Sequence, residues 1–94
     1  MFDFVIKNEI KKFLQPIVES GTKLKMTMLK GEKVIVATNF PTNYRAVFAE
    51  SLGELENFGV QLSTGKYKGE NCLILKKLPR EYIHIIESVI NNFR

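Results

Sequence analysis

Residues 23–38 read KLKMTMLKGEKVIVAT, and residues 61–76 read QLSTGKYKGENCLILK. Each stretch holds two strand-like runs joined by the tripeptide Lys-Gly-Glu, at 30–32 in the first and at 68–70 in the second. A glycine between two such runs supplies the positive φ that a tight hairpin turn requires. The sequence therefore predicts two β-hairpins, one in each half of the chain.

Landmarks around the two hairpins recur at a constant spacing of 38 residues. Gly21 is matched by Gly59, and Pro41 is matched by Pro79. A fixed spacing across separate landmarks is the signature of an internal repeat. We therefore predict one domain over residues 1–94, in which an N-terminal helix at 3–20 precedes repeats at 21–57 and 59–94.

The segments outside the hairpins show helical periodicity. Pro41 and Pro79 follow the second strands of the hairpins, where the fixed φ of proline suits the first turn of a helix, so we expect a helix to begin at each. Gly21 and Gly59 directly follow segments whose apolar residues recur with the spacing of an α-helix, and we expect these glycines to cap the C-termini of the helices. Pro16 is expected to kink the first helix or to end it early.

The resulting order of elements is α-ββ-α-ββ-α. This order predicts an α+β domain with a four-stranded antiparallel or mixed sheet and helices packed on one face. Two hairpins and two helices can close one layer of this kind, as in a circularly permuted ferredoxin-like sheet. An alternative relates the two halves by a pseudo-dyad in a saddle-like sheet. The residues leave both arrangements open.

Composition restricts the partners and the compartment. The formal net charge is +4 and the isoelectric point is about 9.3, which favours anionic partners. Cys72 is the single cysteine, so no intrachain disulfide can form, and the opening residues lack the features of a signal peptide. The apolar runs are much shorter than the roughly 20 residues that span a bilayer. We therefore expect a cytoplasmic protein without a membrane partner.

Groups suited to catalysis are sparse. His84, the sole histidine, falls in a predicted helix and is interpreted as a solvated side chain. Cys72 falls in an apolar strand, where a free cysteine usually acts as a small hydrophobic residue. The tetrapeptide STGK at 63–66 lacks the upstream glycine and the following helix of a phosphate-binding loop. We expect no enzymatic activity, no metal and no cofactor.

Lysines concentrate around the hairpins. Mobile ammonium groups on two neighbouring hairpin tips could contact nucleic-acid phosphates without reading sequence, and one aromatic residue beside the second turn could stack on a ligand. The competing interpretation is that these lysines protect exposed strands from edge pairing. We predict a small basic binding domain that contacts nucleic acid through the following residues: Lys23, Lys25, Lys30, Lys33, Lys66, Tyr67 and Lys68.

Two other classes of function stay open. The last helix has a wide apolar arc, which could form a homodimeric or structural interface, or could instead cover the sheet fully and leave a monomer. A third possibility is a small-molecule site between the sheet and the helices. The candidate interface residues of the last helix are Ile83, Ile86, Ile90 and Phe93.

Overall fold

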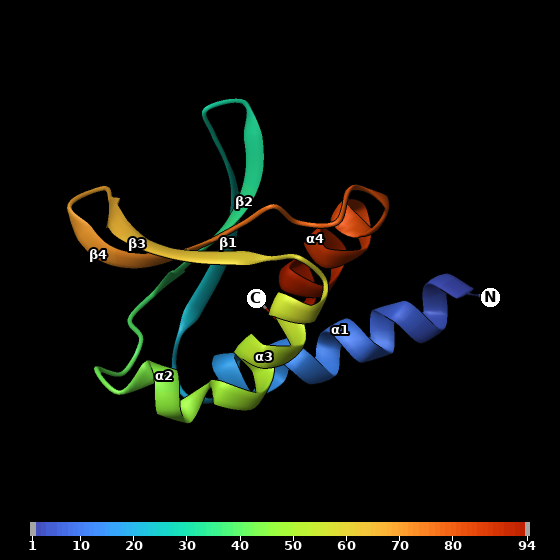
Figure 1. The fold of residues 1–94 in the computed structure, drawn as a ribbon, viewed down its shortest axis with the longest axis horizontal. Helices are drawn as coiled ribbons and strands as arrows, with labels where there is room; N and C mark the ends of the chain where they lie inside the picture. The colour runs from blue at the N-terminus through green and yellow to red at the C-terminus, as the bar shows by residue number, and fades with distance from the viewer. Residues whose placement is uncertain (1, 94) are drawn as a thin grey trace.

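A computed structural model describes residues 2–93, so positions 1 and 94 of the predicted domain lie outside the described residues. The order of the main elements confirms the prediction of an α+β fold of the form α-ββ-α-ββ-α (Figure 1). The elements are α1 (Phe2–Glu19), β1 (Lys23–Leu29), β2 (Glu32–Thr38), α2 (Tyr44–Val47), α3 (Ala49–Asn57), β3 (Gln61–Tyr67), β4 (Glu70–Lys76), the 3-10 turn η1 (Arg80–Tyr82) and α4 (Ile83–Asn92).

The four strands form one antiparallel sheet with the order β1-β2-β4-β3. Each hairpin is paired along its whole length, whereas β2 and β4 are joined by three residue pairs. The middle pair is Val36 and Ile74, which are 38 residues apart in the sequence. The two hairpins therefore run in opposite directions from the centre of the sheet and diverge (Figure 1). The permuted ferredoxin-like and saddle-like descriptions both stay predictions.

Both hairpins close with tight turns of the same kind. In each turn the two central residues have positive φ, Lys30 and Gly31 in the first and Lys68 and Gly69 in the second. Positive φ at both central positions defines the turn whose twist matches that of the flanking strands. The predicted hairpins are confirmed. The predicted caps also have positive φ, and the N–H of Gly21 donates to the carbonyl oxygen of Val18 at the end of α1.

The helix starts differ from the prediction at both later prolines. The first helical residue after Pro41 is Tyr44, and Pro79 is followed by η1 before α4 begins at Ile83. The carbonyl oxygen of each proline accepts a hydrogen bond from the N–H three residues later, so each proline opens a single turn that precedes the helix. Pro16 does not end α1, which continues to Glu19.

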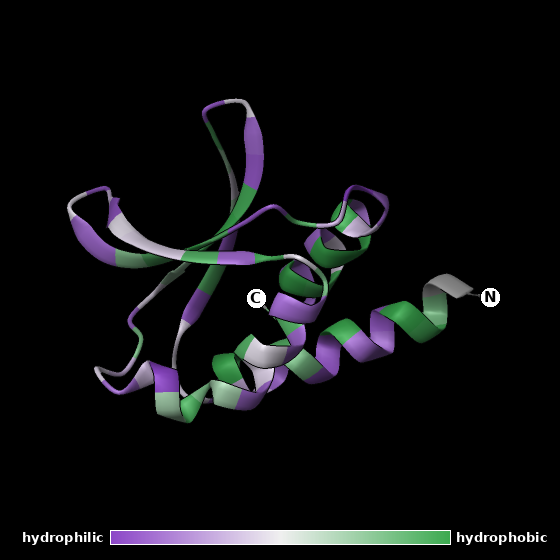
Figure 2. Cartoon of the chain, viewed as in Figure 1, coloured by the Kyte–Doolittle hydropathy of each residue, from purple (hydrophilic) through white to green (hydrophobic). Residues whose placement is uncertain are grey.

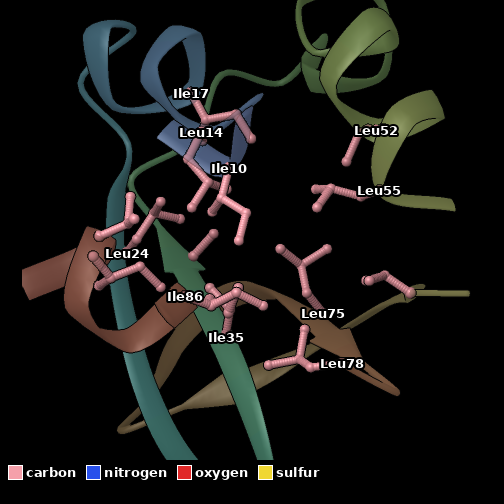
Figure 3. Close-up of a cluster of buried hydrophobic side chains, with 14 of the residues drawn as sticks. Ile10, Leu14, Ile17, Leu24, Ile35, Leu52, Leu55, Leu75, Leu78 and Ile86 are labelled. Atoms are coloured by element: carbon pink, nitrogen blue, oxygen red, sulfur yellow. The ribbon is translucent and has the colours of Figure 1, made fainter. Parts of the chain in front are cut away.

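The main core lies between the helices and one face of the sheet. Figure 3 shows Ile10, Leu14 and Ile17 of α1 and Leu52 and Leu55 of α3 directed toward Ile35 of β2 and Leu75 of β4. Alternate residues of a strand share a face, which explains why Ile35 and Ala37 both belong to this core. Full burial of each large aliphatic side chain contributes about 1.5–3 kcal/mol to folding.

This core also uses the apolar arc of α4. Ile86 is 5% exposed and Ile90 is 1% exposed, because both pack against the sheet and α1. Ile83 and Phe93 are partly buried against the same core. The prediction that these four residues form a homodimer interface is therefore wrong for Ile86 and Ile90, since the chain's own core covers them.

The opposite face of the sheet has no helix and contains a second, smaller apolar cluster. Val34, Val36 and Cys72 are buried there, with Leu29, Tyr67 and Ile74 packed around them. These six residues form three pairs at the 38-residue spacing: Leu29 with Tyr67, Val34 with Cys72, and Val36 with Ile74. Hydrophilic residues occupy the hairpin ends outside this cluster, while the first turns of α1 are hydrophobic (Figure 2).

Candidate functional site

The structure separates the lysines that the sequence placed on neighbouring hairpin tips. Because β2 and β4 are antiparallel, the tip with Lys30 lies at the opposite end of the sheet from the tip with Lys68 (Figure 1). Lys33 lies with Lys30, and Lys66 lies with Lys68. The prediction of one site made from both tips is therefore wrong, and each end must be considered separately.

One end contains a solvent-open hollow of about 650 Å³ between β1 and the β3–β4 hairpin. The hairpin contributes Tyr67, Lys68 and Glu70, and β1 contributes Lys23 and Lys25. We call this hollow the Tyr67 groove. It brings together four of the seven predicted binding residues. Other lining residues come from the sheet and from the ends of α1 and α4, and they include Thr22, Val36, Thr38, Ile90 and Phe93.

The groove exists because the sheet is strongly curved. Strands β1 and β3 are the two outer strands of the sheet, yet the ammonium nitrogen of Lys25 on β1 lies 5.7 Å from the ring centroid of Tyr67 on β3. The β3–β4 hairpin must therefore bend over the helix-free face to reach β1. Tyr67 lies half-buried against the small apolar cluster of that face and also lines the groove.

Polar contacts fix the phenol of Tyr67. Hydrogen bonding with the Thr27 side chain lowers the pKa of Tyr67 below its usual value of 10, although partial burial opposes this effect. The ammonium groups of Lys25 and Lys68 lower this pKa further. Lys68 lies over the same ring, with its Nζ atom 5.5 Å from the centroid. The ring therefore lies close to two ammonium groups, which it attracts by cation–π interaction.

The groove has a positive local charge. Lys23, Lys25 and Lys68 are exposed, and the structure of residues 2–93 shows no ion pair between any of them and a carboxylate. Glu70 adds a single carboxylate to the lining of the groove. The three ammonium groups are thus available to an anion that enters from solvent.

The other end of the sheet has a hollow of about 580 Å³ whose lining includes Glu32, Lys33, Lys77 and Arg80, and two of these four charged side chains have partners. The Nζ atom of Lys33 lies 3.2 Å from the Oε1 atom of Glu87. The Glu32 carboxylate accepts a hydrogen bond of 2.8 Å from the backbone N–H of Lys77. Lys30 is exposed on the turn, and Lys66 is exposed on the outer strand β3 without lining either hollow. Among the described residues, the lining of this hollow includes no aromatic ring beside its cations, so this end differs from the Tyr67 groove and is the weaker candidate.

Other parts of the described chain offer less chemistry. Burial raises the pKa of the Cys72 thiol, which makes it a poor nucleophile at neutral pH. His84 is exposed on α4. Within residues 2–93, no three His, Cys, Asp or Glu side chains gather in a way that could hold a metal ion.

A small apolar pocket lies between α1, α3, η1 and the sheet, where the sequence suggested a small-molecule site. Its volume is about 110 Å³, whereas pockets for drug-sized ligands usually measure about 300–1,000 Å³. Phe58 lies at its rim and forms tilted or edge-on ring contacts with Phe13 and Tyr82. This pocket is smaller than that range, and the small-molecule function stays a prediction.

A comparison of equivalent positions in the two repeats points to the groove, whereas the lysines of the hairpin turns alone do not. We define the counterpart of a residue as the residue 38 positions away in the other half. The counterparts of Lys23, Lys25, Thr27 and Tyr67 are Gln61, Ser63, Gly65 and Leu29. The halves thus share their backbone turns and their small cluster, but the place where β1 of the first half meets the β3–β4 hairpin of the second combines ammonium groups with an aromatic ring, and its equivalent at the other end does not.

Comparisons with known proteins add no assignment, since no protein-family model, curated protein or solved structure matches the chain. The described helices also include none with the combined length and apolar character needed to cross a lipid bilayer. The function is therefore argued from the Tyr67 groove.

Proposed function

We propose that this protein is a non-enzymatic binding domain that contacts nucleic-acid phosphates in the Tyr67 groove without reading base sequence. The observation that supports this proposal is the convergence of three exposed ammonium groups, from Lys23, Lys25 and Lys68, on one groove. The net charge of +4 supports the approach of a polyanion to this surface. The lone, buried Cys72 is compatible with a reducing compartment, and we propose the cytoplasm as the location.

The use of lysine as the cation supports binding that does not discriminate between base sequences. Lysine is a flexible point charge that suits a phosphate, whereas paired recognition of a base edge usually needs a planar side chain such as that of arginine, asparagine or glutamine. The groove lining contains none of these planar side chains among the described residues. Binding energy should therefore come mainly from the release of counterions from the phosphates.

Salt dependence tests the proposal. Binding of a labelled 12-nucleotide strand would be measured by fluorescence anisotropy between about 50 and 200 mM salt. With three phosphate contacts, the slope of log K against log salt should be about −2, because each contact on a single strand contributes about −0.7.

The matched variants use residues that the fold already accepts. The groove variant combines Lys23→Gln and Lys25→Ser, which insert the counterpart residues, with Lys68→Asn, which suits a turn with positive φ. The control replaces Lys7, Lys11 and Lys12 of α1 by Gln, which removes the same charge elsewhere. We expect the groove variant to lose most of the affinity and slope, and the control to keep most of both. Equal losses in both variants, or no binding of the wild type at 50 mM salt, would reject the groove as a phosphate site.

A further inference from the structure

The Tyr67 groove has an apolar part that phosphate binding does not use. Phe93 and the ring of Tyr67 are partly exposed and line it beside the three lysines, while Val36 and Ile90 lie beneath its surface at 2% and 1% exposure. A phosphate gains nothing from apolar or aromatic walls. The base of a nucleotide does, because every base has a flat face that stacks on aromatic rings and excludes water.

The size of the groove limits what can enter. Its volume of about 650 Å³ lies within the range of about 300–1,000 Å³ that holds one drug-sized molecule. A nucleotide unit of a flexible strand is of that order. A duplex is much wider, with a major groove alone about 12 Å across, and it keeps the faces of its bases stacked inside. A duplex could therefore contact the rim lysines but not the apolar walls.

The difference between Tyr67 and its counterpart Leu29 points the same way. Both side chains pack against the small apolar cluster of the helix-free face, so an aliphatic side chain is sufficient for that packing. The aromatic ring lies where Lys25 of β1 and Lys68 of the β3–β4 turn come beside it. Packing against the cluster does not require an aromatic face, whereas that face attracts the two ammonium groups in the free protein and offers a stacking surface to a base.

The acidic residue in the groove also favours a ligand that is not uniformly anionic. The carboxylate of Glu70 repels phosphate but accepts hydrogen bonds from neutral donors such as base amino groups or a ribose 2′-hydroxyl. A strand whose bases are unpaired offers both kinds of group to one groove. Two paired strands hide most of the base donors.

We propose that the Tyr67 groove selects single-stranded over double-stranded nucleic acid, with one base stacked on Tyr67 and the adjoining phosphates held by Lys23, Lys25 and Lys68. This inference rests on the proposed phosphate-binding function and names the form of its ligand. On binding, the Lys68 ammonium moves from above the ring to a phosphate, and the base takes its place. Lys68 can do so because it is exposed on the hairpin turn.

The test compares one labelled DNA 12-mer and its RNA equivalent, each as a single strand and as a duplex, against the wild type, Tyr67→Leu and Tyr67→Phe. The leucine variant inserts the counterpart residue, and the phenylalanine variant keeps the ring without its hydroxyl. We expect Tyr67→Leu to weaken single-strand binding about tenfold, the loss of roughly one stacked base, and to leave duplex binding within about twofold. Tyr67→Phe should stay close to the wild type for both ligands.

The outcomes separate this inference from the proposed function. Duplex binding as tight as single-strand binding, or an equal loss for both ligands in Tyr67→Leu, would overturn the single-strand preference and leave phosphate binding intact. If none of the four ligands shows salt-dependent binding, both the single-strand preference and the proposed phosphate binding are rejected.

An NMR titration of the wild-type protein tests the same contact without a variant. The ring protons of Tyr67 should shift on addition of the single strand and should not shift on addition of the duplex. If the single-stranded RNA binds more tightly than the single-stranded DNA, Glu70 contacts the ribose 2′-hydroxyl. If the two affinities are equal, the contact of Glu70 is with the base.

Discussion

Lys30 and Lys68 have the same backbone conformation, with φ of +52° at each residue, although they lie on turns at opposite ends of the sheet. Each is the first central residue of a hairpin turn, and each is followed by a glycine that also has positive φ. Side chains with a Cβ atom are disfavoured in this region, and asparagine is the residue that best tolerates it besides glycine. Both turns therefore contain a lysine where the backbone alone favours another residue.

Replacement of these lysines should separate stability from binding. Lys30→Asn and Lys68→Asn are each expected to raise the free energy of unfolding by up to about 1 kcal/mol, because the turn strain is relieved. Urea unfolding should show a higher midpoint with an unchanged slope. Only Lys68→Asn should also weaken nucleic-acid binding, since Lys30 does not line the Tyr67 groove. An equal loss of binding in both variants would argue that overall charge matters more than the groove.

Tyr67 should ionise at a lower pH than an unperturbed tyrosine side chain. Its pKa is lowered by hydrogen bonding with Thr27 and by the ammonium groups of Lys25 and Lys68. Absorbance at 295 nm should show one phenol titrating below pH 10, and this phenol should vanish in Tyr67→Phe. Lys25→Ser should move the pKa back toward 10. A lowered folded-state pKa stabilises the fold above the unfolded pKa of tyrosine, and this contribution is lost as the pH falls through the lower folded pKa.

Cys72 should be chemically inert in the folded protein. The side chain is 1% exposed and burial raises its thiol pKa, so both access and thiolate formation are limited. Labelling with a water-soluble thiol reagent should be slow in buffer and complete in denaturant. Cys72→Val inserts the counterpart residue, Val34, and should change the free energy of unfolding by less than about 1.5 kcal/mol. Rapid labelling of the native protein would contradict the packing described for this strand.

Phe48, the fully buried aromatic side chain of the core, should be highly sensitive to truncation. It separates α2 from α3, is 1% exposed, and its N–H donates to the carbonyl oxygen of Tyr44. Phe48→Ala should lower the free energy of unfolding by about 3–5 kcal/mol, which is a large part of the 5–15 kcal/mol typical of a domain. The adjacent Val47 is 48% exposed, and Val47→Ala should change stability by about 0.5 kcal/mol or less. Thermal unfolding followed by circular dichroism measures both.

The local signals in the sequence predicted the elements because they are short-range. Lys30-Gly31-Glu32 and its counterpart predicted both hairpins, since a type of turn depends on only a few residues. The glycines at 21 and 59 predicted the helix ends for the same reason. The prolines predicted helix starts too early, because a proline also suits the turn that precedes a helix.

The site depended on long-range relations that no local pattern contains. The pairing of Val36 with Ile74 decides that the hairpin tips point apart, and that pair joins residues from different halves of the chain. The approach of Lys25 to Tyr67 across the sheet depends on the curvature of all four strands. The burial of Ile86 and Ile90 depends on where α1 packs. Each of these follows from tertiary structure, so residue types could suggest the participants but not their grouping.

The near equivalence of the two halves also offers a route to avidity. Leu29→Tyr, Gln61→Lys and Ser63→Lys would transfer the side chains of the Tyr67 groove to the counterpart positions beside Lys30, on the same helix-free face. A strand long enough to reach both places would bind the second one intramolecularly, at an effective concentration in the millimolar range for a short flexible connection. If the proposed function holds, the wild-type chain, with one such place, would bind and release a strand one nucleotide segment at a time, whereas the two-site version would retain it.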